Sequence, residues 1–275
     1  TYDEPLELGA INGVSATNTV TFQSADANAD SVIWENTANS SATNYVLKLN
    51  GTDHITLKHI TFKNLGVSYS QKIVLSGETD GVTIDSSKFL GYQTNSSSTN
   101  HASIYGTNNA SATGLKIKNS TFTDGGGYAI YLYNSNSNPI TSGLEIINNT
   151  ITDSYSGIYA RYYDALTIRG NTIKGSQMYD RGMHIYYCDG ANVIEDNIIN
   201  APELTHGIYL YYCYGTTDNR PTIVNNLINT EDYGIYLENY TRYQNIYYNT
   251  IHVRDSYALY TYYGNDYHNF KNNIL

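Results

Sequence analysis

The clearest pattern along the chain is a short alternation of apolar and polar residues that returns many times. In Ala129-Ile130-Tyr131-Leu132-Tyr133, apolar Ile130 and Leu132 alternate with tyrosines. Apolar residues at every second position indicate a β-strand with one buried face. The same phrase returns at residues 157–161, 182–186, 207–211, 234–238 and 258–262. These copies predict a set of equivalent short strands.

A second phrase begins with Asn and lies between copies of the first. It occupies residues 149–151, 171–173, 197–199, 226–228, 249–251 and 273–275, and looser copies end at Phe62, Phe89 and Phe122. Consecutive copies are separated by as few as 22 residues (Ile151 to Ile173) and as many as 33 (Phe89 to Phe122). A third alternation occupies residues 55–57, 82–84, 115–117, 144–146, 166–168 and 246–248.

Three short strands in each repeat, separated by turn residues, predict one coil of a parallel β-helix. A helical solenoid would show apolar residues at a period of 3.6, and a propeller blade needs about 40 residues and four strands. We therefore expect an all-β solenoid of about nine to ten coils over residues 21–275. Residues 1–20 lack this phrasing and are expected to be a linker or a partial coil.

Stacked coils place equivalent residues on top of one another, about 4.8 Å apart. The apolar positions of the first phrase should then form an interior stack. The first residues of the second phrase should form an Asn ladder at a turn, with amides bonded to the coils above and below. The ladder comprises Asn149, Asn171, Asn197, Asn226, Asn249 and Asn273.

These phrases resemble the right-handed parallel β-helix superfamily, which includes pectate lyases and related polysaccharide lyases. The resemblance covers essentially the whole chain and implies a right-handed, single-stranded β-helix. The stretch from Thr19 to Phe62 also resembles the opening of β-helix segments in very large secreted surface proteins of Bacteroidota. That resemblance implies a secreted or cell-surface location, and we expect the sequence to be a segment of a longer protein.

Composition narrows the classes of function. The chain has 30 Tyr among 275 residues, a formal net charge of −10 and only 15% charged residues. No apolar run approaches the roughly 18 residues of a membrane helix, and an acidic chain without a basic cluster is a poor nucleic-acid binder. The aromatic content is too high for a disordered chain.

Many of the tyrosines fall at two outward positions of the first phrase. Rings with polar tips suit stacking on sugars and hydrogen bonding to their hydroxyls. The small residues that precede them, such as Gly157 and Gly182, are expected to leave a shallow trough. The alternative is that stacked tyrosines only stabilise the sheet. The candidate glycan-binding residues are Tyr131, Tyr133, Tyr159, Tyr186, Tyr209, Tyr211, Tyr236, Tyr260 and Tyr262.

Acidic residues follow the Asn phrase in several repeats, and Asp153, Asp180, Glu203 and Asp232 are candidate ligands for Ca²⁺. Solvated loop charges are the alternative. No other cofactor is expected.

Two cysteines, Cys188 and Cys213, occupy matched positions 25 residues apart. Adjacent coils would place them within reach of a disulfide, which an extracellular location would permit. The alternative is a pair of stacked free thiols.

Two classes of function remain open. The first is a structural or adhesive rod in a large extracellular protein, contacting other segments of its assembly and binding glycans through the tyrosines. The second is a polysaccharide lyase or hydrolase acting on a uronate-containing glycan, with Arg161, Lys174, Arg181 and His184 as candidates for its acid and base. The scarcity of catalytic groups favours the first.

Overall fold

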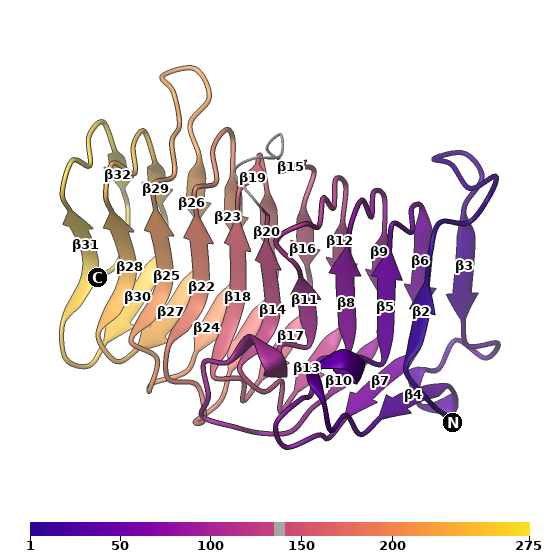
Figure 1. The fold of residues 1–275 in the computed structure, drawn as a ribbon. Helices are drawn as coiled ribbons and strands as arrows, with labels where there is room; N and C mark the ends of the chain where they lie inside the picture. Colours follow the sequence, from indigo (N-terminus) through magenta and orange to yellow (C-terminus); the bar gives the residue numbers. More distant parts are fainter. Residues whose placement is uncertain (135–140) are drawn as a thin grey trace.

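The chain folds into a rod of stacked coils in a computed structural model, which describes residues 1–134 and 141–275 (Figure 1). Three parallel sheets of ten strands each run along the rod, and every coil adds one strand to each sheet. The two ends of the chain lie at opposite ends of the rod (Figure 1). The predicted parallel β-helix is therefore confirmed.

Each sheet takes every third strand of the main series. The first sheet contains β1 (Tyr2–Asp3), β4 (Ile33–Asn36), β7 (Thr61–Asn64), β10 (Lys88–Leu90), β13 (Thr121–Thr123), β17 (Thr150–Thr152), β21 (Thr172–Lys174), β24 (Ile198–Asn200), β27 (Leu227–Thr230) and β30 (Thr250–Val253). The second contains β2 (Leu6–Leu8), β5 (Leu47–Asn50), β8 (Ile73–Ser76), β11 (Ile104–Gly106), β14 (Tyr128–Tyr133), β18 (Ser156–Arg161), β22 (Arg181–Tyr186), β25 (His206–Tyr211), β28 (Tyr233–Glu238) and β31 (Tyr257–Tyr262). The third contains β3 (Val20–Gln23), β6 (Ile55–Lys58), β9 (Thr83–Asp85), β12 (Lys116–Lys118), β16 (Glu145–Ile147), β20 (Thr167–Arg169), β23 (Val193–Glu195), β26 (Thr222–Val224), β29 (Asn245–Tyr247) and β32 (Asn269–Lys271).

The remaining elements are small. Strands β15 (Thr141–Ser142) and β19 (Tyr163–Asp164) form a two-stranded sheet. The 3₁₀-helices are η1 (Ala29–Ser31), η2 (Ser41–Thr43) and η3 (Thr99–His101). None of the helices in the described residues is long and apolar enough to span a membrane.

The N-terminal segment belongs to the solenoid. Strand β1 pairs with β4 and β2 pairs with β5, so residues 2–8 start the first and second sheets. In the structure this segment is thus a partial coil.

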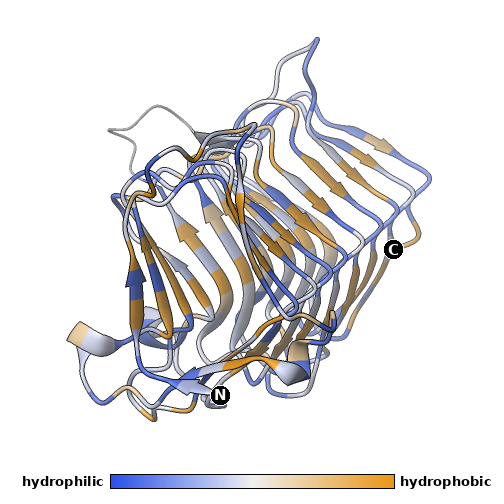
Figure 2. Cartoon of the chain, turned by 90° about the vertical axis from the view of Figure 1, so that its right-hand side faces the viewer, coloured by the Kyte–Doolittle hydropathy of each residue, from blue (hydrophilic) through white to orange (hydrophobic). Residues whose placement is uncertain are grey.

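The core is built from columns of equivalent residues. Figure 2 shows hydrophobic positions aligned from strand to strand along the rod. On the first sheet, Phe62, Phe89 and Phe122 stack with ring centroids 5.4 and 4.5 Å apart, and all three are fully buried. Such stacking combines the hydrophobic effect of burial with a favourable ring geometry.

The predicted Asn ladder is confirmed at the turn between the third and first sheets. The amide of Asn171 donates to Oδ1 of Asn197 at 3.0 Å and to the carbonyl of Ile146 at 2.8 Å. The same pattern continues along the column Asn149, Asn171, Asn197, Asn226, Asn249 and Asn273. The residue before each ladder Asn has a positive φ, which Asn, Asp and Gly adopt most readily. At this turn, Asn148, Gly170, Asp196 and Asn225 follow that preference.

Candidate functional site

The three sheets present different outer faces. On the first sheet, Thr121, Thr150 and Thr172 form an outward column. The third carries ion pairs between coils, such as Lys116 with Glu145 at 2.9 Å. The second sheet carries the aromatic residues and is the candidate site.

The outer face of the second sheet has its tyrosines in register. We call the outward side chains of β14, β18, β22, β25, β28 and β31 the Tyr face. Its central column is Tyr131, Tyr159, His184, Tyr209, Tyr236 and Tyr260, with consecutive ring centroids 4.5 to 5.3 Å apart. Its distal column is Tyr133, Arg161, Tyr186, Tyr211, Glu238 and Tyr262. The two columns predicted from the sequence, including all nine candidate tyrosines, are therefore side by side in the structure.

Two further columns on or beside this face were not predicted. A proximal column contains Tyr128, Arg181, His206, Tyr233 and Tyr257. A corner column follows the strands and contains Tyr162, Tyr187, Tyr212, Tyr240 and Tyr263, with consecutive ring centroids 4.9 to 5.8 Å apart. All five corner tyrosines have a positive φ, which is uncommon for a bulky residue. The matched positions of Tyr187 and Tyr212 after equivalent strands were the signal that could have revealed this column.

Access to the Tyr face is uneven. Tyr159 and Tyr209 are only 8% and 7% exposed, whereas Tyr262 is 52% exposed. Tyr133, Tyr186 and Tyr211 are half-buried. A ligand would therefore reach the distal column more readily than the closely packed rings of Tyr159 and Tyr209, which lie beside it in the central column.

The prediction of a shallow trough beside the tyrosines is wrong. Gly157, Gly182, Gly207 and Gly234 are buried, and a Cβ on Gly207 would lie 2.6 Å from both the Gly234 carbonyl and Cγ2 of Ile228. A side chain at any of these positions would point into the interior, where the second sheet approaches the first. These glycines permit close packing and leave no groove outside.

Arg161 interrupts the distal column and lies among aromatic rings. Its guanidinium carbon lies 4.5 Å from the ring centroid of Tyr133 and 4.7 Å from those of Tyr162 and Tyr186. One guanidinium nitrogen donates to the hydroxyl of Tyr162 at 3.2 Å. Cation–π attraction of this kind stabilises a partly desolvated cation.

Arg181 and His206 of the proximal column lie next to His184 of the central column. Arg181 pairs with Asp180 at 2.6 Å and lies 4.6 Å from the ring centroid of Tyr209. His184 stacks edge-on between Tyr159 and Tyr209. Burial, reinforced by the positive charge of Arg181, lowers the pKa of His206 to about 4 and holds the pKa of His184 well below its usual value.

The catalytic candidates are only partly brought together. Arg161, Arg181 and His184 share the Tyr face, whereas Lys174 ends β21 on the first sheet. The ring of His184 is held between two tyrosines and is uncharged near neutral pH. Lyase chemistry at these residues stays a prediction.

The lowered histidine pKa values make stability depend on pH in the acid range. A neutral buried imidazole stabilises the folded state above its unfolded pKa, near 6.5, and this contribution is lost as the pH falls toward about 4. We expect the free energy of unfolding to fall by on the order of 2 kcal/mol through His206 alone between pH 7.5 and 4.5, allowing for its partial exposure. Urea unfolding at both pH values measures this, and His206→Phe should flatten the dependence. An unchanged pH dependence in the variant would contradict the assignment.

The phenols of the Tyr face are hydrogen-bond donors at physiological pH. Burial raises the pKa of Tyr131, Tyr186 and Tyr236 to about 12. The hydroxyl of Tyr209 donates to Oε2 of Glu238, and burial together with this bond raises its pKa further. The face thus offers apolar rings tipped with neutral hydroxyls.

The two cysteines are free and buried in the structure, so the disulfide considered from the sequence is not formed. The thiol of Cys188 lies 3.5 Å from the carbonyl of Ala160, and that of Cys213 lies 3.4 Å from the carbonyl of Ile185. Both thiols therefore point toward the preceding coil, in the same direction along the rod, and not toward one another. Burial raises the pKa of Cys188 to about 12.

Three of the four acidic residues proposed for Ca²⁺, all but Asp232, use their carboxylates in other contacts. Asp180 pairs with Arg181, Glu203 lies 3.4 Å from Arg254, and Oδ1 of Asp153 accepts from the backbone of Gln177. The described residues contain no group of three or more His, Cys, Asp or Glu side chains suited to a metal ion.

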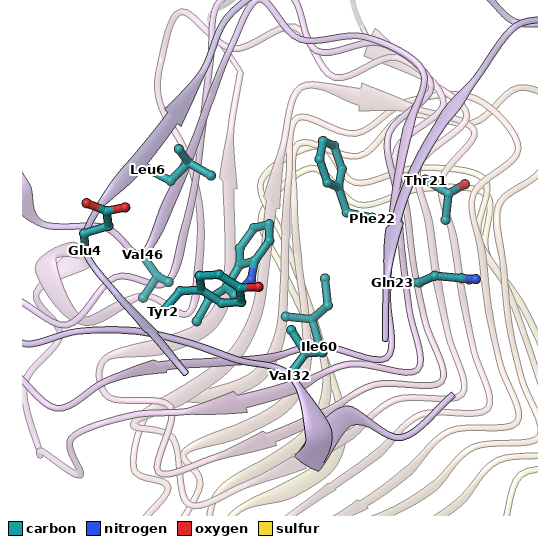
Figure 3. A pocket seen from close by; sticks show the side chains of 10 residues that line it. Tyr2, Glu4, Leu6, Thr21, Phe22, Gln23, Val32, Val46 and Ile60 are labelled. Carbon is teal, nitrogen blue, oxygen red and sulfur yellow. The ribbon is translucent and has the colours of Figure 1, made fainter. Parts of the chain in front are cut away.

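An apolar pocket lies elsewhere, at the N-terminal end of the rod. Figure 3 shows its lining side chains around the open end of the first coil. They are Tyr2, Glu4, Leu6, Thr21, Phe22, Gln23, Val32, Trp34, Val46 and Ile60. None of them belongs to the Tyr face.

Comparison with known proteins identifies the fold family. The family model described as "Right handed beta helix region" matches residues 45–228 and 102–275. No curated protein and no solved structure matches the chain.

Proposed function

We propose that this chain, which belongs to the right-handed β-helix family, is an extracellular structural or adhesive rod that binds glycans through its Tyr face. The observation that carries the proposal is the register of the tyrosines across six consecutive coils. A regular row of rings, with neighbouring centroids 4.5 to 5.3 Å apart, suits an extended polysaccharide.

The chemistry of the face supports a carbohydrate ligand. The half-buried rings of Tyr186 and Tyr211 lie 4.6 Å apart, so their edges and hydroxyls form a continuous strip. Neutral phenols can donate to and accept from sugar hydroxyls. The Arg161 guanidinium, fixed among rings, adds further donors. Because these groups are held by stacking, little side-chain entropy would be lost on binding.

Affinity measurements with a panel of soluble polysaccharides, including uronate-containing ones, test the proposal. The double substitution Tyr186→Ala/Tyr211→Ala should weaken binding about tenfold or more, because each ring contributes on the order of 1 kcal/mol. The matched control is Tyr247→Ala, which removes a half-buried tyrosine from the outer face of the third sheet. Equal weakening by the control, or no binding to any member of the panel, would overturn the proposal.

A further inference from the structure

The corner column brings tyrosines of consecutive coils together at the turn that follows the second sheet. The rings of Tyr162 and Tyr187 stack with centroids 5.1 Å apart and an interplanar angle of 13°. Those of Tyr187 and Tyr212 stack at 4.9 Å and 18°. Nearly parallel rings at this spacing place the ortho carbons of one phenol beside those of the next. Phenols of adjacent coils are therefore within reach of one another.

The backbone at these tyrosines is in a conformation that tyrosine rarely adopts. The φ angle is 60° at Tyr162 and 51° at both Tyr187 and Tyr212. This left-handed region favours Gly and Asn, and the turn of the Asn ladder uses Asn148 and Gly170 at such positions. A strained backbone conformation at a bulky residue points to a use for its side chain.

Tyr187 and Tyr212 lie beside the two cysteines. Cys188 and Cys213, the next residues along the chain, are fully buried and free. The phenols of Tyr187 and Tyr212 are half-buried, so solvent and an oxidant reach them. The same two coils thus carry a matched pair of buried thiols, which are not bonded, and a matched pair of accessible phenols, which stack.

The other stacked pair is less suited to oxidation. The hydroxyl of Tyr162 accepts a hydrogen bond from Arg161 at 3.2 Å, and the guanidinium carbon lies 4.7 Å from the Tyr162 ring centroid. The same carbon lies 5.8 Å from the ring centroid of Tyr187. A cation over a ring opposes the removal of an electron from that ring. Tyr187 and Tyr212 are therefore the better reaction partners.

We propose that Tyr187 and Tyr212 form a modification site, where a haem peroxidase acting with hydrogen peroxide joins two consecutive coils through a dityrosine bond. Each phenol gives up one electron and its hydroxyl proton, and hydrogen peroxide takes up two electrons and two protons to form two water molecules. The two radicals couple through one ortho carbon each. Each of these carbons then releases its proton while each phenolic oxygen regains one, so the two tyrosines lose two hydrogen atoms overall.

Formation of the bond needs little rearrangement. In dityrosine the ring centres lie slightly closer together than the 4.9 Å between Tyr187 and Tyr212, so the rings need only tilt toward one another. The bond closes a loop between residues 25 positions apart, and a cross-link of this kind restricts the unfolded chain. The cross-linked coils should therefore resist unfolding more strongly. This inference does not depend on glycan binding.

Treatment of the dilute chain with a haem peroxidase and hydrogen peroxide, followed by isolation of the monomer, tests the proposal. The monomer should show dityrosine fluorescence, and its unfolding should shift to a higher urea concentration than in the untreated chain. Cleavage before aspartate separates residues 180–188, which contain Tyr187, from residues 196–217, which contain Tyr212. Mass spectrometry should find these two peptides joined, with the loss of two hydrogen atoms.

Two variants assign the bond to its residues. Tyr187→Phe and Tyr212→Phe each keep the ring and remove the hydroxyl, so both should be folded by circular dichroism and should lack the joined peptides. The matched control is Tyr214→Phe, because Tyr214 is a half-buried tyrosine in the same peptide whose ring is tilted by 50° from that of Tyr212. It should cross-link like the wild-type chain. A monomer without dityrosine would overturn the proposal, and so would joined peptides that persist in Tyr187→Phe.

Discussion

Replacing Asn197 with alanine is expected to destabilise the protein by on the order of 4 kcal/mol. The Asn197 side chain takes part in four buried hydrogen bonds. Its amide donates to the carbonyl of Ile168 and to Asn226, and its oxygen accepts from the backbone N–H and the amide of Asn171, all at 2.9 to 3.0 Å. Alanine leaves these buried partners unsatisfied, and each costs about 1–3 kcal/mol before any water enters.

The measurement is the free energy of unfolding from urea titration, with the m-value checked for constancy. Asn200→Ala is the matched control, because Asn200 is exposed on the same coil and its side-chain oxygen accepts a hydrogen bond from the amide of Asn229. It should change stability by less than about 1 kcal/mol. A similar loss in both variants would show that the ladder has no special role.

The ladder and the sheets could be predicted from the sequence because each depends on a phrase that repeats at equivalent positions. Asn149-Thr150-Ile151 and Asn171-Thr172-Ile173 specify both a turn and a strand, and stacking then follows from the period. The two columns of tyrosines on the second sheet followed in the same way. Repetition makes one local inference apply to many coils at once.

Other features depend on distances between sheets, which no single phrase encodes. From the sequence, Gly207 was expected to leave a trough on the outside of the sheet. In the structure the position faces inward, where a Cβ would meet Ile228 of the first sheet. The matched Cys188 and Cys213 suggested a bond, yet the direction of their thiols depends on turn geometry. The burial of Lys72 was not predicted, because its coil has Lys where later copies of the first phrase have glycine.

Replacing Lys72 with methionine is expected to stabilise the protein by on the order of 4 kcal/mol at pH 7. Lys72 is fully buried and its ammonium has no hydrogen-bond partner in the described residues. It occupies the column that holds glycine in later coils, and a Cβ on Gly91 would lie 2.4 Å from its Nζ. Burial, only partly opposed by the charge of Asp124, lowers the pKa of Lys72 to about 7. Methionine removes the buried charge with little change in volume.

The lowered pKa of Lys72 also makes the stability of the wild-type chain depend on pH. Between about pH 7 and 10.5 the unfolded chain binds more protons at Lys72 than the folded chain, so stability should rise with pH. Below about pH 7 both states are protonated and this contribution levels off. Urea unfolding at pH 7.5 and 9.5 should show the rise in the wild-type chain and its absence in Lys72→Met. Lys174→Met, at an exposed lysine, should behave like the wild-type chain. A Lys72→Met variant less stable than the wild-type chain would contradict this account.

The most direct test of the Tyr face is a chemical footprint of its phenols with and without a bound polysaccharide. Hydroxyl-radical oxidation followed by peptide mass spectrometry reports the accessibility of each tyrosine ring. With ligand present, Tyr133, Tyr186 and Tyr262 should be protected, while Tyr248, which is 57% exposed at the turn between the third and first sheets, should react as before. Protection of Tyr248 with no change at the distal column would contradict the assignment of this face.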